Sequence, residues 1–213
     1  AATSDMAPDA PPISEDWMNV FESEAAHMGS EQMQHLFGKI LAGEIRRPTS
    51  YSIKTIRLVA QLDNQAASLF KRLCSLSISL RLPSFGTIHD ARVVSMGDAN
   101  ANSLQAYGLG FDALNILHEY GLIISDYNSH MDYRISAAYG GNIILPMTYQ
   151  GAKWGLFPKV NPQDPKEFKV NGVVFSRSGK ELLSIVEVDE DKQYTSALHA
   201  FLDTQGMQMV MLP

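Results

Sequence analysis

The sequence predicts an α+β fold, in which a helical N-terminal half is followed by a winged-helix-like, mostly antiparallel β-containing half. Apolar residues recur at helical spacing through residues 14–82. From residue 122 onwards the hydrophobic period shifts towards two, which is typical of strands. The regular alternation of strands and helices that marks a doubly wound fold is missing. These three observations favour helices first and hairpins second.

The composition is that of an ordinary globular protein. The chain has 213 residues, of which 45% are hydrophobic and 19% charged, and this is enough apolar mass for a real core. Its net charge of −6 argues against a dedicated nucleic-acid binder, whose phosphate contacts need Lys and Arg, but leaves room for a local basic face. No apolar run reaches the roughly 18–20 residues of a membrane span, so we expect a cytoplasmic protein with no membrane partner.

The chain divides into three predicted regions. Residues 1–13 are rich in Ala, Pro and Asp and are expected to form a flexible linker or tail. Residues 14–82 are expected to form a helical region, and residues 83–213 an α+β region with hairpins that packs on it. Because the chain starts at Ala1 without an initiator Met, we expect it to be a fragment, a processed form or a trimmed version of a protein.

Four helices of the helical region are predicted from residues that cap helix N-termini, because a Ser or Asp side chain accepts hydrogen bonds from the free amides of the first turn. The predicted caps are Ser14, Ser30, Ser52 and Asp63. Gly43 is expected to end the second helix as a left-handed C-cap. Cys74, the only cysteine, lies on an apolar stretch of the fourth helix and is expected to be buried rather than reactive.

The second half is predicted to be built from hairpins. A strand at Ala91–Ser95 and a helix at Phe111–Tyr120 come first, and Ser178 is expected to open a later short helix. Turn residues then separate three pairs of strand-like segments. The pairs are Leu122–Tyr127 with Tyr133–Ala138 around Asn128-Ser129-His130, Asn142–Tyr149 with Ala152–Phe157 around Gln150-Gly151, and Phe168–Val170 with Val173–Ser176 around Asn171-Gly172. A final helix at Lys192–Thr204 and a final strand at Met207–Leu212 complete the prediction.

Two loops resemble phosphate-binding motifs but fail on context. Gly108-Leu109-Gly110-Phe111-Asp112-Ala113 matches a dinucleotide fingerprint, yet no convincing strand precedes it and a hairpin follows it. The segment Ser176–Glu181 contains Gly-Lys but lacks the P-loop spacing, and Glu181 replaces the hydroxyl that would hold magnesium. We instead predict that Ser178 and Glu181 form a capping box at a helix start. No cofactor is predicted.

No catalytic or metal site can be predicted from spacing. The six histidines show no metal-ligand spacing with another His or Cys, and no nucleophile elbow is present. An enzyme is therefore the less favoured class. If the protein is an enzyme, its site must assemble from distant residues, and the candidates are His89, Asp90, His118 and Glu119.

The densest group of basic residues consists of Arg46, Arg47, Lys54 and Arg57. Two interpretations are open, a solvated helix end and face or a contact with nucleic acid or an acidic partner. The helix and following Gly-Leu-Ile within residues 111–133 are typical of the junction between helix and wing in winged-helix modules. Acidic residues surround this junction, which favours a protein-interaction role over DNA readout.

Two stretches carry a family resemblance. The first combines Trp17-x3-Phe21, the segment Met33–Ile45, Pro48 and the segment Ser50–Ile56, and the second is Phe175–Leu183. Together they resemble a bacterial family of uncharacterised proteins, catalogued only as a domain of unknown function. The resemblance implies a bacterial, cytoplasmic setting and supplies no activity, ligand or catalytic residue. The chain departs from the family at Thr49, where a Gly is expected in the turn after Pro48.

The leading hypothesis is a non-enzymatic protein-interaction or regulatory module of a bacterial protein, with a protein partner or a second copy of the chain bound to it. Nucleic-acid binding and an enzyme with a dispersed site are the alternatives. Glu44 is expected either to accept hydrogen bonds from free amides of the turn near Ser50–Ser52 or to be solvated.

Overall fold

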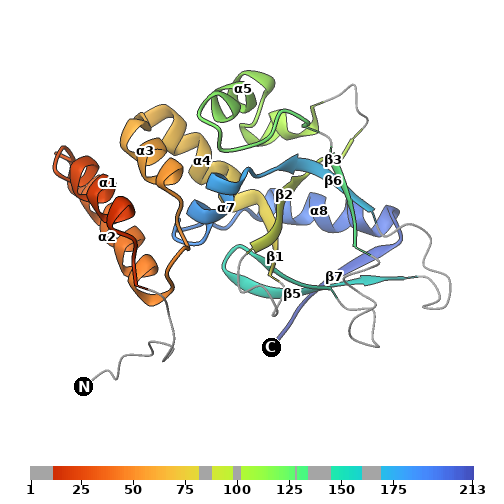
Figure 1. Ribbon diagram of the computed structural model, residues 1–213. Coiled ribbons are helices and arrows are strands. Elements are labelled where there is room, and N and C mark those ends of the chain that lie inside the picture. Colours follow the sequence, from red (N-terminus) through yellow and green to blue (C-terminus); the bar gives the residue numbers. More distant parts are fainter. Residues whose placement is uncertain (1–11, 82–87, 98–101, 128, 134–144, 160–168) are drawn as a thin grey trace.

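One antiparallel sheet, with helices gathered at one end and along its side, makes up the protein, which is therefore α+β as predicted (Figure 1). The computed structural model describes residues 12–81, 88–97, 102–127, 129–133, 145–159 and 169–213. Most of the predicted tail lies outside these residues, although Ile13 already packs against the core.

The four predicted N-terminal helices are confirmed, and each begins at its predicted cap. The side chains of Ser14, Ser30, Ser52 and Asp63 each accept a hydrogen bond from the backbone amide three residues later. Asp191 caps the last helix in the same way. The helices are α1 (Glu15–Ala25), α2 (Glu31–Arg46), α3 (Ile53–Gln61), α4 (Asn64–Leu76), the 3-10 helix η1 (Ser103–Tyr107), α5 (Phe111–Glu119), α7 (Arg177–Leu183) and α8 (Lys192–Thr204).

The predicted C-cap at Gly43 is wrong, because α2 continues through this residue to Arg46. A Cβ atom at Gly43 would lie only 2.7 Å from Cε2 of the Tyr51 ring. The glycine is therefore needed for close packing against Tyr51, which is 4% exposed. A sequence pattern cannot distinguish these two uses of a glycine near a helix end.

Every pairing between the described strands is antiparallel, and the sheet has the order β3-β6-β2-β1-β4-β5-β7. β1 was not predicted, and its position is central although it lies within the predicted helical region. β1 follows α4 without a break, so the helical pattern of α4 obscures the short alternating pattern of β1 in the sequence. The strands are β1 (Ser77–Arg81), β2 (Ile88–Val94), β3 (Ser129–Asp132), β4 (Leu145–Tyr149), β5 (Ala152–Pro158), β6 (Lys169–Val174) and β7 (Met207–Met211).

Of the three predicted hairpins, the one around Gln150-Gly151 is confirmed. Tyr149 pairs with Ala152, which leaves a two-residue turn. Both turn residues have positive φ, 47° at Gln150 and 75° at Gly151, as a primed hairpin turn requires. Residues 142–144, the start of the first predicted arm, lie outside the described residues.

The predicted turn at Asn171-Gly172 is wrong, because β6 runs straight through both residues. Gly172 pairs with Ser129 on one side and with Val94 on the other. A Cβ atom there would lie 2.1 Å from the carbonyl oxygen of Val93. The glycine thus permits a close approach of two strands. In the sequence, an Asn-Gly pair needed for this tertiary contact looks the same as an Asn-Gly pair that forms a turn.

The predicted hairpin around residues 128–130 is also wrong. Ser129 and His130 begin β3 instead of forming a turn, and β3 pairs with β6. Just after α5, Ile123 forms an isolated bridge with Phe175. Residues 134–138 of the second predicted arm lie outside the described part of the chain. In the described residues, β3 therefore pairs with the distant segment β6.

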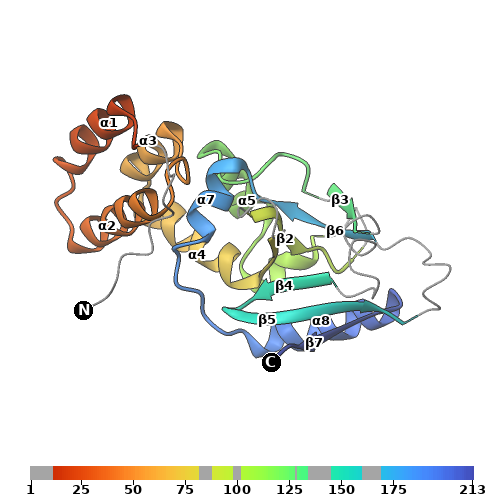
Figure 2. The ribbon, with the colours of Figure 1, turned by 60° about the horizontal axis from the view of Figure 1, so that its bottom comes forward.

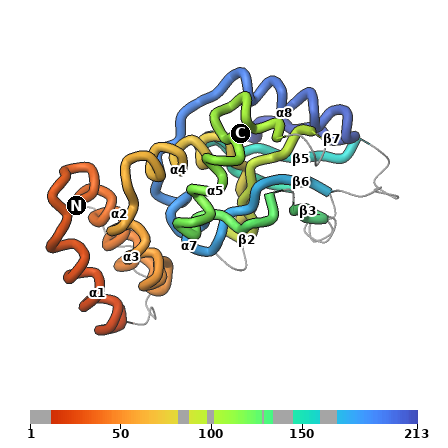
Figure 3. Tube along the Cα trace, turned by 90° about the horizontal axis from the view of Figure 1, so that it is seen from above, coloured from red at the N-terminus to blue at the C-terminus, as the bar shows by residue number. Residues whose placement is uncertain are grey.

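Two sets of helices stand out by their position relative to the sheet. α1, α2 and α3 group at one end of the molecule, and α8 runs alongside β5 and β7 (Figures 2 and 3). Tyr194 of α8 donates a hydrogen bond to the carbonyl oxygen of Val94 at 3.2 Å, and its side chain is completely buried. Among the described helices, none has both the length and the apolar character to cross a membrane.

Candidate anion-binding pocket

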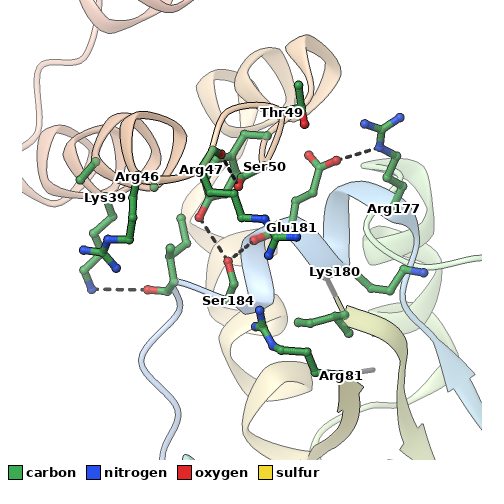
Figure 4. A pocket seen from close by; sticks show the side chains of 15 residues that line it. Lys39, Arg46, Arg47, Thr49, Ser50, Arg81, Arg177, Lys180, Glu181 and Ser184 are labelled. Atoms are coloured by element: carbon green, nitrogen blue, oxygen red, sulfur yellow. Dashed lines mark hydrogen bonds and ion pairs between the residues drawn. The ribbon is translucent and has the colours of Figure 1, made fainter. Parts of the chain in front are cut away.

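A pocket of about 690 Å³ lies where the end of α2 and the α2–α3 loop face α7 and the end of β1 (Figure 4). Its charged lining is strongly one-sided, because six of the side chains are basic and only Glu181 is acidic. The basic residues are Lys39, Arg46, Arg47, Arg81, Arg177 and Lys180. The pocket thus collects six of the 17 Lys and Arg residues of a chain whose net charge is −6.

Glu181, the single carboxylate of the pocket, is already bound on both oxygens. Its Oε2 accepts hydrogen bonds at the start of α3, from the amide of Ser52 at 2.8 Å and from Oγ1 of Thr55 at 2.6 Å. Its Oε1 accepts from Nε of Arg177 at 2.8 Å. Glu181 therefore fastens α7 to the first turn of α3 and fixes one wall of the pocket.

The predicted capping box at Ser178 and Glu181 is wrong. The cap of α7 is Ser176, whose hydroxyl accepts a hydrogen bond from the amide of Gly179 at 3.0 Å. Ser178 is buried inside the helix. A Cβ atom at Gly179 would lie 2.1 Å from the carbonyl oxygen of Leu122, so this glycine also serves a close backbone contact. Glu181 caps a different helix from the one that contains it.

Glu44 holds the α2–α3 loop that forms the opposite wall, which confirms one of its two predicted roles. The carboxylate is 3% exposed. It accepts hydrogen bonds from the amides of Thr49 at 2.6 Å and Tyr51 at 3.0 Å. Thr49 has φ of 70°, in the left-handed region that favours glycine, and this explains why a Gly is expected after Pro48.

The pocket joins the helical group to the rest of the protein through further contacts. Nζ of Lys39 lies 2.8 Å from Oε1 of Glu187, beyond the end of α7. The hydroxyls of Tyr51 and Ser184 lie 3.2 Å apart. Burial raises the pKa of Tyr51, so this hydroxyl stays neutral and serves as a hydrogen-bonding group at ordinary pH.

The predicted basic cluster is divided by the structure. Arg46 and Arg47 line the pocket just described. Lys54 and Arg57 line a second pocket, of about 620 Å³, together with Glu119 and three other residues. Lys39 lies on α2 with Arg46 and was missed by the sequence analysis. The other three cations, Arg81, Arg177 and Lys180, could not be found by spacing, because they come from β1 and α7. The only local signal was the Arg177–Lys180 segment, which a helix cap also explains.

The four candidate enzyme residues are not gathered in this pocket. His89 is exposed and Asp90 is buried, because neighbouring residues of a strand point to opposite faces. His118 and Glu119 lie at the exposed end of α5. In the part of the chain that the structure describes, no three His, Cys, Asp or Glu side chains are grouped so that they could hold a metal ion.

Asp90 is bound by neighbouring side chains inside the protein. Its carboxylate accepts hydrogen bonds from Nε of Arg92 at 2.7 Å and from the Tyr133 hydroxyl at 2.5 Å. Burial alone would raise the pKa of Asp90, but the bonds and charge of Arg92, with Tyr133, hold it below its usual value. Cys74 is buried as predicted, and burial raises the pKa of its thiol well above the usual value.

Comparison with known proteins gives one match. A family model described as "Protein of unknown function (DUF2806)" matches residues 2–199. Neither a curated protein nor a solved structure matches the chain.

Proposed function

The chain belongs to the DUF2806 family of proteins of unknown function, and because that family supplies no activity, we propose a function from the basic pocket. The protein is a non-enzymatic interaction module that binds an anionic partner there. The observation that carries this proposal is the accumulation of cations in one concave site. Six basic side chains and one carboxylate leave a formal charge of 6 − 1 = +5 among the lining residues, on a chain with a net charge of −6.

Such a site attracts anions for two physical reasons. A cleft lined by charges of one sign concentrates the electric field and raises the local concentration of oppositely charged ligands. Four of the six cations are arginines, whose planar guanidinium groups bind carboxylate or phosphate oxygens in pairs. The side chain of Arg177 is 76% exposed although it pairs with Glu181, so an incoming anion can reach this guanidinium.

The hydroxyls of the pocket support binding rather than catalysis. Oγ of Ser50 donates to the carbonyl oxygen of Arg47 at 2.6 Å, and Oγ of Ser184 donates to the carbonyl oxygen of Glu181 at 2.6 Å. A nucleophilic serine needs its proton directed to a base. Here each proton is directed to a backbone carbonyl, and the hydroxyls stabilise the walls of the pocket.

Retention on a heparin column tests this proposal, because heparin is a general polyanion. We expect the protein to be retained at low salt and the R46A/R177A variant to elute at clearly lower salt. The matched control is K153A/K192A, which removes two cations that line neither pocket. Equal elution of the two double variants, with folding confirmed by circular dichroism, would contradict the proposal.

We further propose a bacterial cytoplasm as the setting of this module. The resemblance to a bacterial family supports it, and so does a single cysteine that is buried and needs no oxidising environment. The anionic partner is then an intracellular macromolecule or metabolite. Cell fractionation of a bacterium that encodes the protein tests this location, and recovery in the periplasm would contradict it.

A further inference from the structure

We propose that the anionic partner is a single-stranded nucleic acid, whose backbone runs from the basic pocket across the first turn of α3 into the second pocket, lined by Lys54 and Arg57. This inference rests on the proposed function, since it names the partner of the same pocket. It adds a second binding surface and a path between the two.

The two pockets are neighbours through a short series of contacts. Nζ of Lys54 lies against Gly121, since a Cβ atom there would be 3.7 Å from it. The carbonyl oxygen of Gly121 accepts a hydrogen bond from Oγ of Ser176 at 2.6 Å. The next residue, Arg177, lines the first pocket and has a side chain that is 76% exposed. Arg177 is therefore the cation of the first pocket that these contacts connect to Lys54 of the second.

The first turn of α3 is the ridge between the pockets. Ser50 and Tyr51, just before the helix, line the first pocket, whereas Lys54 and Arg57 line the second. Residues three apart lie on the same helix face, about 4.5 Å apart along the axis at about 1.5 Å per residue. Cations thus recur along a track, and this arrangement suits a ligand with recurring negative charges better than a small anion, which would need one pocket only.

The second pocket favours a nucleic-acid strand over an acidic peptide. Its charged lining residues are Lys54, Arg57 and Glu119, which give 2 − 1 = +1, so charge alone is weak there. It also contains Tyr120, which is only partly buried and whose hydroxyl donates to Oδ2 of Asp63 at 2.9 Å. Aromatic rings on which bases stack, beside cations that track the backbone, are typical of single-strand binding surfaces. A fixed ring beside two cations offers this combination.

The test is fluorescence anisotropy with a labelled single-stranded oligonucleotide of about 16 nucleotides, at the upper end of the site sizes that single-strand binding folds show. The logarithm of the binding constant should fall linearly with the logarithm of salt concentration, and each phosphate contact should add about 0.7 to the steepness of that slope. R46A/R177A and K54A/R57A should each reduce that slope by about 1.4, which corresponds to two contacts of about 0.7 each. K153A/K192A should leave it unchanged.

Several results would overturn the inference. They are failure to bind the oligonucleotide at low salt, unchanged binding by K54A/R57A, and equal or tighter binding of a duplex or of a poly-glutamate chain of matched charge. If heparin retention still depends on Arg46 and Arg177 while the oligonucleotide does not bind, only the identity of the partner is wrong. If neither ligand depends on them, the proposed function fails as well.

Discussion

Replacing Arg92 with methionine should severely destabilise the protein, because this guanidinium connects three strands inside the sheet. Its side chain is 1% exposed. Nε and Nη2 donate to the two oxygens of Asp90 at 2.7 and 2.9 Å. Nη1 donates to the carbonyl oxygens of Ser129 at 2.9 Å and Val170 at 2.7 Å. This one side chain of β2 thus links β3 and β6 as well.

The magnitude follows from what the substitution leaves behind. In R92M the Asp90 carboxylate remains buried, with the Tyr133 hydroxyl as its remaining side-chain partner of those described above. Breaking a buried ion pair on one side costs about 3–5 kcal/mol, since an uncompensated charge stays in the core. Two backbone carbonyls also lose a charged donor. We therefore expect a loss of at least about 3 kcal/mol in the free energy of unfolding.

The dependence on pH identifies the cause. In the native protein the folded-state pKa of Asp90 is lowered, so its contribution to stability is present above the unfolded-state pKa and is lost as pH falls through the folded-state value. In R92M, burial without Arg92 should raise the folded-state pKa above the unfolded-state value. The variant then regains stability as pH falls towards about 4, the ordinary range of an Asp. Its deficit relative to the native protein should shrink in acid.

Urea denaturation at neutral and acidic pH measures both effects, with the double variant D90L/R92M as the control. Removal of both charges leaves no unpaired ion, so the double variant should lose less than the sum of the two single variants. A loss below about 1 kcal/mol for R92M, or a deficit that does not change with pH, would refute the reasoning. Either result would mean that water or another donor forms hydrogen bonds with the Asp90 carboxylate in the variant.

Three further predictions concern single positions. G172A should lose at least about 1–3 kcal/mol in urea denaturation, because its Cβ would lie 2.1 Å from the carbonyl oxygen of Val93, and native stability in this variant would contradict the close approach of the strands. T49G should gain up to about 1 kcal/mol in the same assay, because a left-handed conformation costs an L-residue about 1–2 kcal/mol. The greater freedom of glycine in the unfolded chain offsets part of this gain. A loss of stability would show that the Thr side chain is needed. Cys74 should resist a maleimide reagent in the native protein and react fully in denaturant, as followed by mass spectrometry, because it is 1% exposed and burial raises its thiol pKa; rapid native labelling would contradict this.

Local chemistry made the helices readable from the sequence. A Ser or Asp at the N-cap acts within three residues, so Ser14, Ser30, Ser52 and Asp63 could be assigned without tertiary information. The turn at Gln150-Gly151 is readable for the same reason, because positive φ at two successive residues is a local requirement.

Sequence reasoning misassigned Gly43 and Gly172, and these two glycines and Gly179 are all explained by contacts with other segments of the chain. Gly43 makes room for the Tyr51 ring, Gly172 for the backbone of Val93 and Gly179 for the backbone of Leu122. Their flanking residues resemble a helix end, a hairpin turn and a phosphate loop. No local pattern carries the information that another segment passes within van der Waals contact.

In the candidate site, too, sequence reasoning found only residues that are close along the chain. The sequence pointed to Arg46 and Arg47 as part of a basic group, and it raised Glu44 as an acceptor for the following turn, because these residues are close along the chain. Arg81, Arg177 and Lys180 join them only when β1 and α7 converge with the end of α2. The fold also separates Lys54 and Arg57 into a second pocket.

By itself the sequence determined the α+β class, the starts of the four N-terminal helices, one hairpin and the family, because each depends on local preferences or on similarity along the chain. The tertiary structure alone decided the strand order, the role of the glycines and the position of the basic pocket. The physical reason is that charge and backbone contact act through space. Glu181 is the plainest case, since it lies in α7 but caps α3 through bonds to residues 126 and 129 positions away.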